Sequence, residues 1–173
     1  ETEETLAVEV WRGGADGAFA RFTVPRRPNQ TVLDVVSHIQ RHLDPSLSYR
    51  FACRVGMCGS CAMTVNGRPR WTCRTHVDRV APDGRLEIAP LAHLPIVRDL
   101  VADMAPFFDK WAAVDGRFHG TATRRDPFAR VRPDDPRRRR ADAGIECIGC
   151  GVCYAACDVV AQRPDYPGPA ALN

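Results

Sequence analysis

The chain has 173 residues, of which 45% are hydrophobic and 26% are charged, which is typical of a soluble globular protein. A net charge of +3 is too small to indicate a nucleic-acid partner, and no apolar run approaches the roughly 18 residues of a membrane span. No segment has the basic start and apolar core of an export signal. Because the first residue is Glu1 rather than Met, we expect some N-terminal sequence to be missing.

The N-terminal segment predicts a strand hairpin followed by a helix. TLAVEVW (5–11) alternates apolar and polar residues, and AFARFTV (18–24) follows after the turn sequence GGADG. The apolar spacing of TVLDVVSHIQRHL (31–43) is helical. Thr31 is its expected N-cap, and Asp34 three residues later completes a capping box.

A second hairpin is predicted after the first cysteines. AMTV (62–65) and RPRWTC (68–73) flank Asn-Gly, the favoured pair for a two-residue turn. RLEIAPL (85–91) is expected to be a closing strand. A hairpin, a helix, a loop and further short strands favour an α+β fold that begins with a β-grasp domain.

The pattern changes after Pro95, where we place a boundary between domains 1–95 and 96–173. Residues 96–114 have a helical period that Pro106 interrupts. Residues 115–140 carry nine arginines against four aspartates and are expected to form an irregular linker or surface crossing. Short helices are expected around the last cysteines, so the second domain is predicted to be mainly helical.

Cysteine is the most informative residue type. The eight cysteines fall into two groups of four with none between them: Cys53, Cys58, Cys61 and Cys73, then Cys147, Cys150, Cys153 and Cys157. A disulfide-rich secreted protein spreads its cysteines through a short chain. Two dense groups without an export signal favour metal sites in a reducing compartment.

The first group has the spacing C-x4-C-x2-C-x11-C, whose first three positions match the plant-type 2Fe–2S loop. Gly56 and Gly59 can adopt positive φ and let backbone N–H groups approach the sulfurs. Cys73 is expected on the return strand of the second hairpin, and Arg54 places positive charge beside the site. A structural zinc site is the alternative, although zinc usually takes two cysteine pairs on separate knuckles.

The second group, CIGCGVCYAAC, has the bacterial ferredoxin spacing C-x2-C-x2-C-x3-C. Three thiolates on one tight turn suit a cubane better than a single zinc ion, and the fourth usually serves a different cluster. Gly149 and Gly151 can adopt positive φ here, as Gly56 and Gly59 can in the first group. Ferredoxin runs place proline after the fourth cysteine, where this chain has Asp158. One cubane held by all four thiolates remains an alternative.

Other polar features have simpler interpretations. His38 and His42 are expected on a solvated helix face. Arg137–Arg140 fits either contact with anionic lipid or a partner subunit, or a solvated charged turn. Trp71, Phe107 and Phe108 are expected to pack in a core or an interface. No phosphate loop or nucleophile arrangement is present, so we expect no bond-making catalytic residues on this chain.

The combination of a plant-type loop and a ferredoxin run resembles the iron–sulfur subunit of succinate dehydrogenase and fumarate reductase, the succinate:quinone oxidoreductase family. The resemblance extends over essentially the whole chain. It is clearest in the segments CRVGMCGSCAMTVNG, PIVRDLVADMAPFF, IECIGCGVC and PGPAALN.

The resemblance implies three clusters on one chain. Cys53, Cys58, Cys61 and Cys73 would hold 2Fe–2S; Cys147, Cys150 and Cys153 would give three ligands to 4Fe–4S; and Cys157 would give one ligand to 3Fe–4S. The supporting residues would be Arg54, Gly56, Gly59, Ser60, Gly149 and Gly151. The family's remaining cysteines lie downstream, so we expect the last two clusters to need ligands beyond Asn173 and the chain to be truncated.

The resemblance also implies partners and a place in the cell. A flavoprotein subunit with FAD and a membrane anchor, which carries haem in some members, would bring a quinone nearby. The chain would then be a peripheral respiratory subunit, linked to the tricarboxylic acid cycle, at the cytoplasmic face of a bacterial inner membrane. The stretch after Cys157 lacks the tryptophan that many members use for quinone, so no quinone residues are assigned.

Two rival functions remain open at this point. The chain could be a similar subunit that serves another flavin-dependent dehydrogenase, which co-purification with a flavoprotein active on succinate would separate. It could also be a zinc-stabilised binding module, which iron and sulfide analysis would decide.

Overall fold

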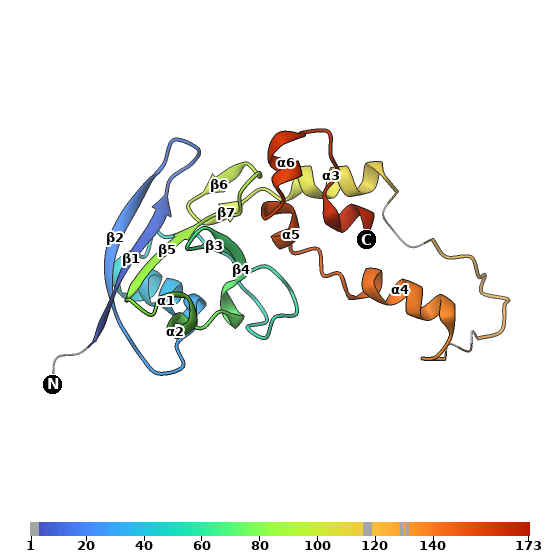
Figure 1. Cartoon of the computed structure of the whole chain (residues 1–173), viewed down its shortest axis with the longest axis horizontal. Coiled ribbons are helices and arrows are strands. Elements are labelled where there is room, and N and C mark those ends of the chain that lie inside the picture. Colours follow the sequence, from blue (N-terminus) through green and yellow to red (C-terminus); the bar gives the residue numbers. More distant parts are fainter. Residues whose placement is uncertain (1–3, 116–118, 129, 131) are drawn as a thin grey trace.

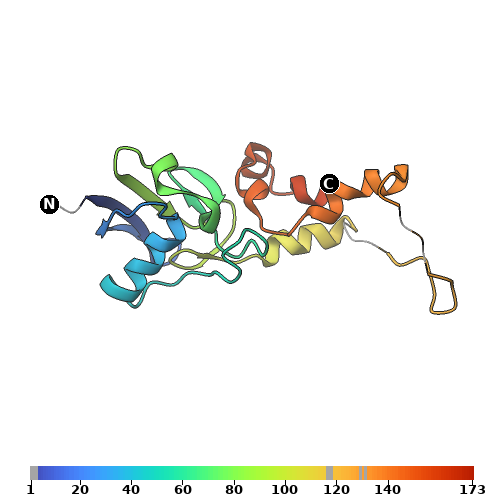
Figure 2. The same ribbon diagram turned by 90° about the horizontal axis from the view of Figure 1, so that it is seen from below.

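The computed structural model describes residues 4–115, 119–128, 130 and 132–173. Figure 1 shows an elongated molecule with a sheet unit (4–90) at one end and a helical unit (104–173) at the other. The view from below keeps the two units side by side, joined near the middle of the molecule (Figure 2).

The sheet unit contains a five-stranded mixed sheet in the order β2-β1-β5-β3-β4. Strands β1 (Thr5–Arg12) and β2 (Ala18–Pro25) form the predicted antiparallel hairpin, which is confirmed. Strand β5 (Arg85–Ala89) runs parallel to β1 at the centre of the sheet. The second predicted hairpin is also confirmed: β3 (Ala62–Val65) pairs with β4 (Arg68–Trp71) across Asn66-Gly67.

One face of the sheet is covered by helix α1 (Val32–His38), as Figure 1 shows. The predicted capping box is present, because Asp34 N donates to Thr31 Oγ1 at 3.2 Å and Thr31 N donates to Asp34 Oδ2 at 3.0 Å. The predicted single helix over 31–43 continues as a π-helical turn, η1 (Ile39–Leu43). A short helix α2 (Val77–Val80) precedes β5. Apolar residues of these elements form the main core.

The prediction of a helix over 96–114 is wrong in its first half. Residues 96–102 form a small hairpin of β6 (Ile96–Arg98) and β7 (Val101–Ala102). Asp99 lies in its turn with φ of 51°. Its buried carboxylate accepts hydrogen bonds from Gly13 N at 2.7 Å and Ser48 N at 2.9 Å. These partners lie on distant loops, and a helix could not present Asp99 to both.

The second half of that prediction is confirmed as helix α3 (Ala105–Ala113). Pro106 lies in its first turn, where the missing N–H costs nothing, so the proline starts this helix instead of interrupting it. Phe107 is 1% exposed and makes edge-to-face contacts with Trp111 and Tyr154. These rings form the centre of the core of the helical unit.

The expected irregular segment 115–140 ends earlier than predicted. Helix α4 (Pro136–Glu146) begins within it, capped by Asp135, whose carboxylate accepts from Arg137 N at 2.8 Å. Arg137–Arg140 therefore lies on a helix, because Asp135 followed by proline is a strong helix start. The short helices expected nearby are α5 (Val152–Ala155), α6 (Asp158–Gln162) and the 3-10 turn η3 (Pro169–Leu172).

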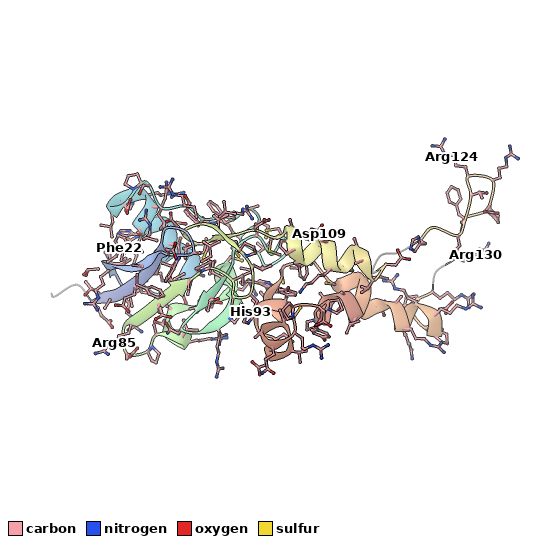
Figure 3. The ribbon with its side chains drawn as sticks, turned by 90° about the horizontal axis from the view of Figure 1, so that it is seen from above. Phe22, Arg85, His93, Asp109, Arg124 and Arg130 are labelled. Atoms are coloured by element: carbon pink, nitrogen blue, oxygen red, sulfur yellow. The ribbon has the colours of Figure 1, made fainter. Side chains whose placement is uncertain are left out.

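Residues 119–128, which precede α4 in the chain, extend away from both units (Figure 3). Figure 3 shows Arg124 at the tip of this extension, while His93 lies near the junction of the sheet and the helices. Over the described residues, no helix combines the length and apolar character that crossing a membrane requires.

Candidate iron–sulfur sites

The loop Cys53–Cys61 folds so that backbone N–H groups surround a sulfur. Cys53 Sγ accepts hydrogen bonds from the backbone N of Val55, Met57 and Cys58 at 3.4, 3.3 and 3.3 Å. Positive φ values at Arg54 (60°) and Gly56 (77°) turn the chain around this sulfur. The loop therefore places three backbone donors around the sulfur of Cys53, as the binding loops of iron–sulfur clusters do.

Cys61 and Cys73 form the buried side of the same group, with 3% and 7% exposure. Cys73 was expected on the return strand, but β4 ends at Trp71 and Cys73 lies in the 3-10 turn η2 (Thr72–Arg74). The turn is tied to Cys61, because Thr72 N and Thr72 Oγ1 donate to its carbonyl at 3.2 and 2.9 Å. These bonds replace the strand ladder and hold the two thiols in one small core with Leu33.

The thiols of this group have opposite pKa shifts. Burial, then the neighbouring Cys61 thiol, raises the pKa of Cys73 to about 11. Cys58 is exposed, and its Sγ lies 3.0 Å from Ser60 Oγ. The hydrogen bond with the Ser60 hydroxyl, followed by the backbone N–H of Cys53, lowers the pKa of Cys58 to about 6. The loop thus favours a thiolate on its exposed side.

Arg54 contacts α1 as well as the loop. Its guanidinium lies 3.7 Å from the Asp34 carboxylate and 5.2 Å from the centre of the Phe51 ring. The predicted positive charge beside the first cysteine group is therefore present, and it is shared with the first turn of α1. The adjacent Val55 and Met57 are exposed apolar side chains.

The second cysteine group lies on the boundaries of short helices. Cys147 follows α4, Cys153 lies within α5 and Cys157 immediately precedes α6. The predicted glycine conformations are present, with φ of 64° at Gly149 and 74° at Gly151. Gly151 is the N-cap of α5, and Ala155 N donates to its carbonyl at 2.9 Å.

Cys147 and Cys150 act on Cys153 through their charge. The residue Cys153 is exposed as a whole, yet desolvation around its sulfur is the first cause that raises the pKa of this thiol. The charges of Cys150 and Cys147 raise it further. Cys147 and Cys157 pack against the core of the helical unit. A bound cation would relieve this repulsion at Cys153.

The two cysteine groups meet at Gly59 and Cys150, a contact that could not be predicted from the sequence. A Cβ atom placed on Gly59 would lie 2.4 Å from Cys150 Cβ. A cavity of about 140 Å³ lies at the same junction. Its lining includes Cys58, Gly59, Ser60, Gly149 and Cys150. Ninety residues separate the two loops in the chain, so only the tertiary fold brings them together.

The residue types in both groups fit iron–sulfur clusters. In the described part of the chain, no group of three or more His, Cys, Asp or Glu side chains is arranged to hold a metal ion. Cysteines supply the candidate ligands in both groups, with glycines at positive φ beside them. Backbone donors to sulfur, such as Val55 N and Met57 N, leave no mark in the sequence because any residue other than proline supplies them.

The comparisons with known proteins agree with this chemistry. Residues 7–109 match the family described as "2Fe-2S iron-sulfur cluster binding domain". The chain is 36% identical over 162 residues to the fumarate reductase iron-sulfur subunit of Haemophilus influenzae, with 88% of this chain covered. It is 37% identical over 142 residues to the succinate dehydrogenase iron-sulfur subunit of Paracoccus denitrificans, covering 82% of this chain and 53% of that protein.

A solved structure shows the same fold. A chain of the Mycobacterium smegmatis Sdh1 complex in the apo form superimposes with a TM-score of 0.84 at 28% identity. The match covers 98% of this chain and 72% of that chain. The chain spans about 62% of the length of the Haemophilus relative. The resemblance seen in the sequence is confirmed, and this chain belongs to the family of 2Fe–2S iron–sulfur cluster binding domains.

Proposed function

We propose that this chain is an iron–sulfur electron-transfer subunit of the succinate dehydrogenase and fumarate reductase type. The single observation that carries the proposal is the direct contact between two separate cysteine loops at Gly59 and Cys150. Electron transfer between two centres requires that their binding loops lie close together, and a pair of structural metal sites has no such requirement.

Within this proposal the sheet unit is a β-grasp, plant-type 2Fe–2S domain that takes up residues 1–95. The order β2-β1-β5-β3-β4 with β5 parallel to β1 supports it. Cys53, Cys58, Cys61 and Cys73 would hold the 2Fe–2S cluster. The backbone donors to Cys53 and the Ser60 contact with Cys58 would tune its potential.

Residues 96–173 would form the bacterial-ferredoxin-like domain. Cys147, Cys150 and Cys153 would give three ligands to a 4Fe–4S cluster, and the proximity that lets the charges of Cys150 and Cys147 raise the pKa of Cys153, after its desolvation, supports this. Cys157, on the other side of α5, would give a ligand to a 3Fe–4S cluster. Both of these clusters would take further cysteines from sequence beyond Asn173. When bound, such clusters accept and release electrons one at a time.

The proposed partners follow from the named relatives. A flavoprotein with FAD would exchange electrons at the sheet unit, and a membrane anchor, with haem in some cases, would hold the helical unit near a quinone. The chain itself would be peripheral, at the cytoplasmic face of a bacterial inner membrane. Its residues would hold the clusters, exclude water and orient the loops, and none would make or break substrate bonds.

Iron and acid-labile sulfide analysis of the protein purified without oxygen, with EPR after reduction, tests the proposal. We expect a reduced 2Fe–2S signal that Cys53→Ser abolishes. Met57→Leu is the matched control, because Met57 is 69% exposed and contributes only its backbone N–H to Cys53. That variant should keep the signal.

Zinc in stoichiometric amount without sulfide would refute the proposal. A chain that carries iron and sulfide but co-purifies with a flavoprotein inactive on succinate and fumarate would assign it to another dehydrogenase.

A further inference from the structure

Gly59 occupies an unusual position in the first cysteine loop. It is buried, whereas its neighbours Cys58 and Ser60 are exposed. Its φ is 70°. The atoms nearest to an added Cβ all belong to the second loop: Cys150 Cβ at 2.4 Å, Cys150 Cα at 3.0 Å and Ile148 Cδ1 at 3.4 Å. The backbone of one cysteine loop therefore lies directly against a candidate ligand of the other.

We infer that Gly59 is the positioning residue that sets the separation between the two cluster-binding loops, and that its lack of a side chain is what permits their contact. This inference rests on the proposed function, because the separation matters only if both loops carry redox centres. It concerns a distance between sites, which no assignment of ligands to clusters specifies.

The neighbours of Gly59 cannot easily move away from an added methyl group. Separations below 3.0 Å require a shift, and here the obstructing atoms are the Cα and Cβ of Cys150 and not the end of a flexible side chain. Cys150 lies between Gly149 and Gly151, whose φ values of 64° and 74° fix a tight turn. On the other side, Ala62 N donates to Gly59 O at 3.0 Å and ties the loop to β3.

The close approach also limits the space between the groups. The junction cavity of about 140 Å³ is lined by apolar side chains such as Leu91 and Met104 beside Cys58 and Cys150. Met104 Cε lies 2.8 Å from the position of a Cβ on Gly151, so the second loop is packed closely from that side too. A wedge at Gly59 would separate the loops and admit water between them.

Two glycine-to-alanine variants separate this contact from backbone strain. Gly59→Ala adds a methyl group at the junction. Gly67→Ala, with φ of 74°, imposes a similar strain in the β3–β4 turn, where an added Cβ meets nothing within 4 Å.

The decisive readout is the magnetic interaction between the two reduced centres in the cluster-loaded protein that includes the cysteines proposed beyond Asn173. It is measured as broadening and faster relaxation of the 2Fe–2S EPR signal, and it falls with the cube of the distance between the centres. We expect Gly59→Ala to weaken it while keeping iron at both sites, and Gly67→Ala to retain it. Equal interaction in the two variants would overturn the inference.

A second readout does not depend on bound iron. Hydrogen exchange of the cluster-free protein should show roughly tenfold faster exchange over 147–157 in Gly59→Ala than in Gly67→Ala, because the contact at Cys150 is lost. If the parent protein binds no iron, the proposed function fails and this exchange difference still tests the contact. If it binds iron and the exchange rates are equal, the contact fails alone.

Discussion

The two cysteine groups are supported in different ways by the fold. Cys61 and Cys73 are buried beside a five-stranded sheet with its own large core. The second group lies in and around α5 and α6, helices of four and five residues, and none of its cysteines is fully buried. Isolated helices of this length are not stable. The first site is therefore organised by the protein before metal binds, and the second depends more on what it binds.

The largest expected effect is the response to cluster removal. Stripping iron with a chelator after oxidation should leave amide protection in β1 and β5 nearly unchanged and remove most protection over 147–173. The core of the helical unit is smaller than that of the sheet unit, so its folding depends more on the free energy of ligand binding. Hydrogen exchange with mass spectrometry measures both regions at once. Equal loss of protection in the two units would show that the sheet unit is not self-supporting.

The next largest effect is expected from the core of the helical unit. Phe107→Ala should destabilise this unit by about 3–5 kcal/mol, because the ring is buried and a cavity would remain. Phe108→Ala is the matched control, since this neighbouring ring is 49% exposed and should cost roughly 1 kcal/mol. Urea unfolding followed by hydrogen exchange in α5 compares the two. A similar cost for both variants would contradict the assigned core.

A smaller effect is expected at Lys110, the only lysine in the chain. Its Nζ donates to Tyr154 Oη at 2.8 Å and to the carbonyl of Tyr166 at 3.2 Å, joining α3 to α5. Lys110→Met keeps the apolar stem and should cost about 1.5–3 kcal/mol through the lost charged hydrogen bonds. Thermal unfolding measures the change, and Asp109→Asn on the same helix is a control expected to change it little.

The smallest effect on folding is expected from pH, through the first cysteine group. Because the pKa of Cys58 is lowered to about 6, its contribution to stability is complete above the ordinary thiol pKa. The contribution is lost as the pH falls through about 6. In cluster-free protein, iodoacetamide should modify Cys58 with a midpoint near that value, while Cys73 stays unreactive until the pH approaches 11. Similar midpoints for the two thiols would contradict the described loop geometry.

The parts of the fold that follow from local chemistry could be predicted from the sequence. The Asn66-Gly67 turn and the Thr31–Asp34 capping box each use residues within a few positions of one another, and both are present. The hairpin at 96–102 could not be predicted, because Asp99 is satisfied by Gly13 and Ser48, which lie far away in the chain. The apolar residues within 96–102 have helical spacing, but contacts with residues distant in the chain favour a hairpin instead.

The same division applies to the candidate sites. Cysteine spacing indicated the two loops and their glycines, because ligand spacing is a local property. The assignment of each cysteine to a cluster remains a prediction. The contact of Gly59 with Cys150 had no signal in the sequence, and neither did the tie of Lys110 to Tyr154. The first contact depends on how the second cysteine loop packs against the sheet unit, and the second depends on how α3 packs against α5.

Asp99 has a consequence for dividing the protein into parts. Burial alone would raise the pKa of this carboxyl, but the N–H groups of Gly13 and Ser48 and the Arg12 guanidinium outweigh it and lower the pKa. A fragment ending at Pro95 would lack the Asp99 carboxylate, so these donors would lose their acceptor. It would also remove Leu100 from the main core. We therefore expect a separately expressed sheet unit to need the hairpin through Ala102, past the point where the composition changes.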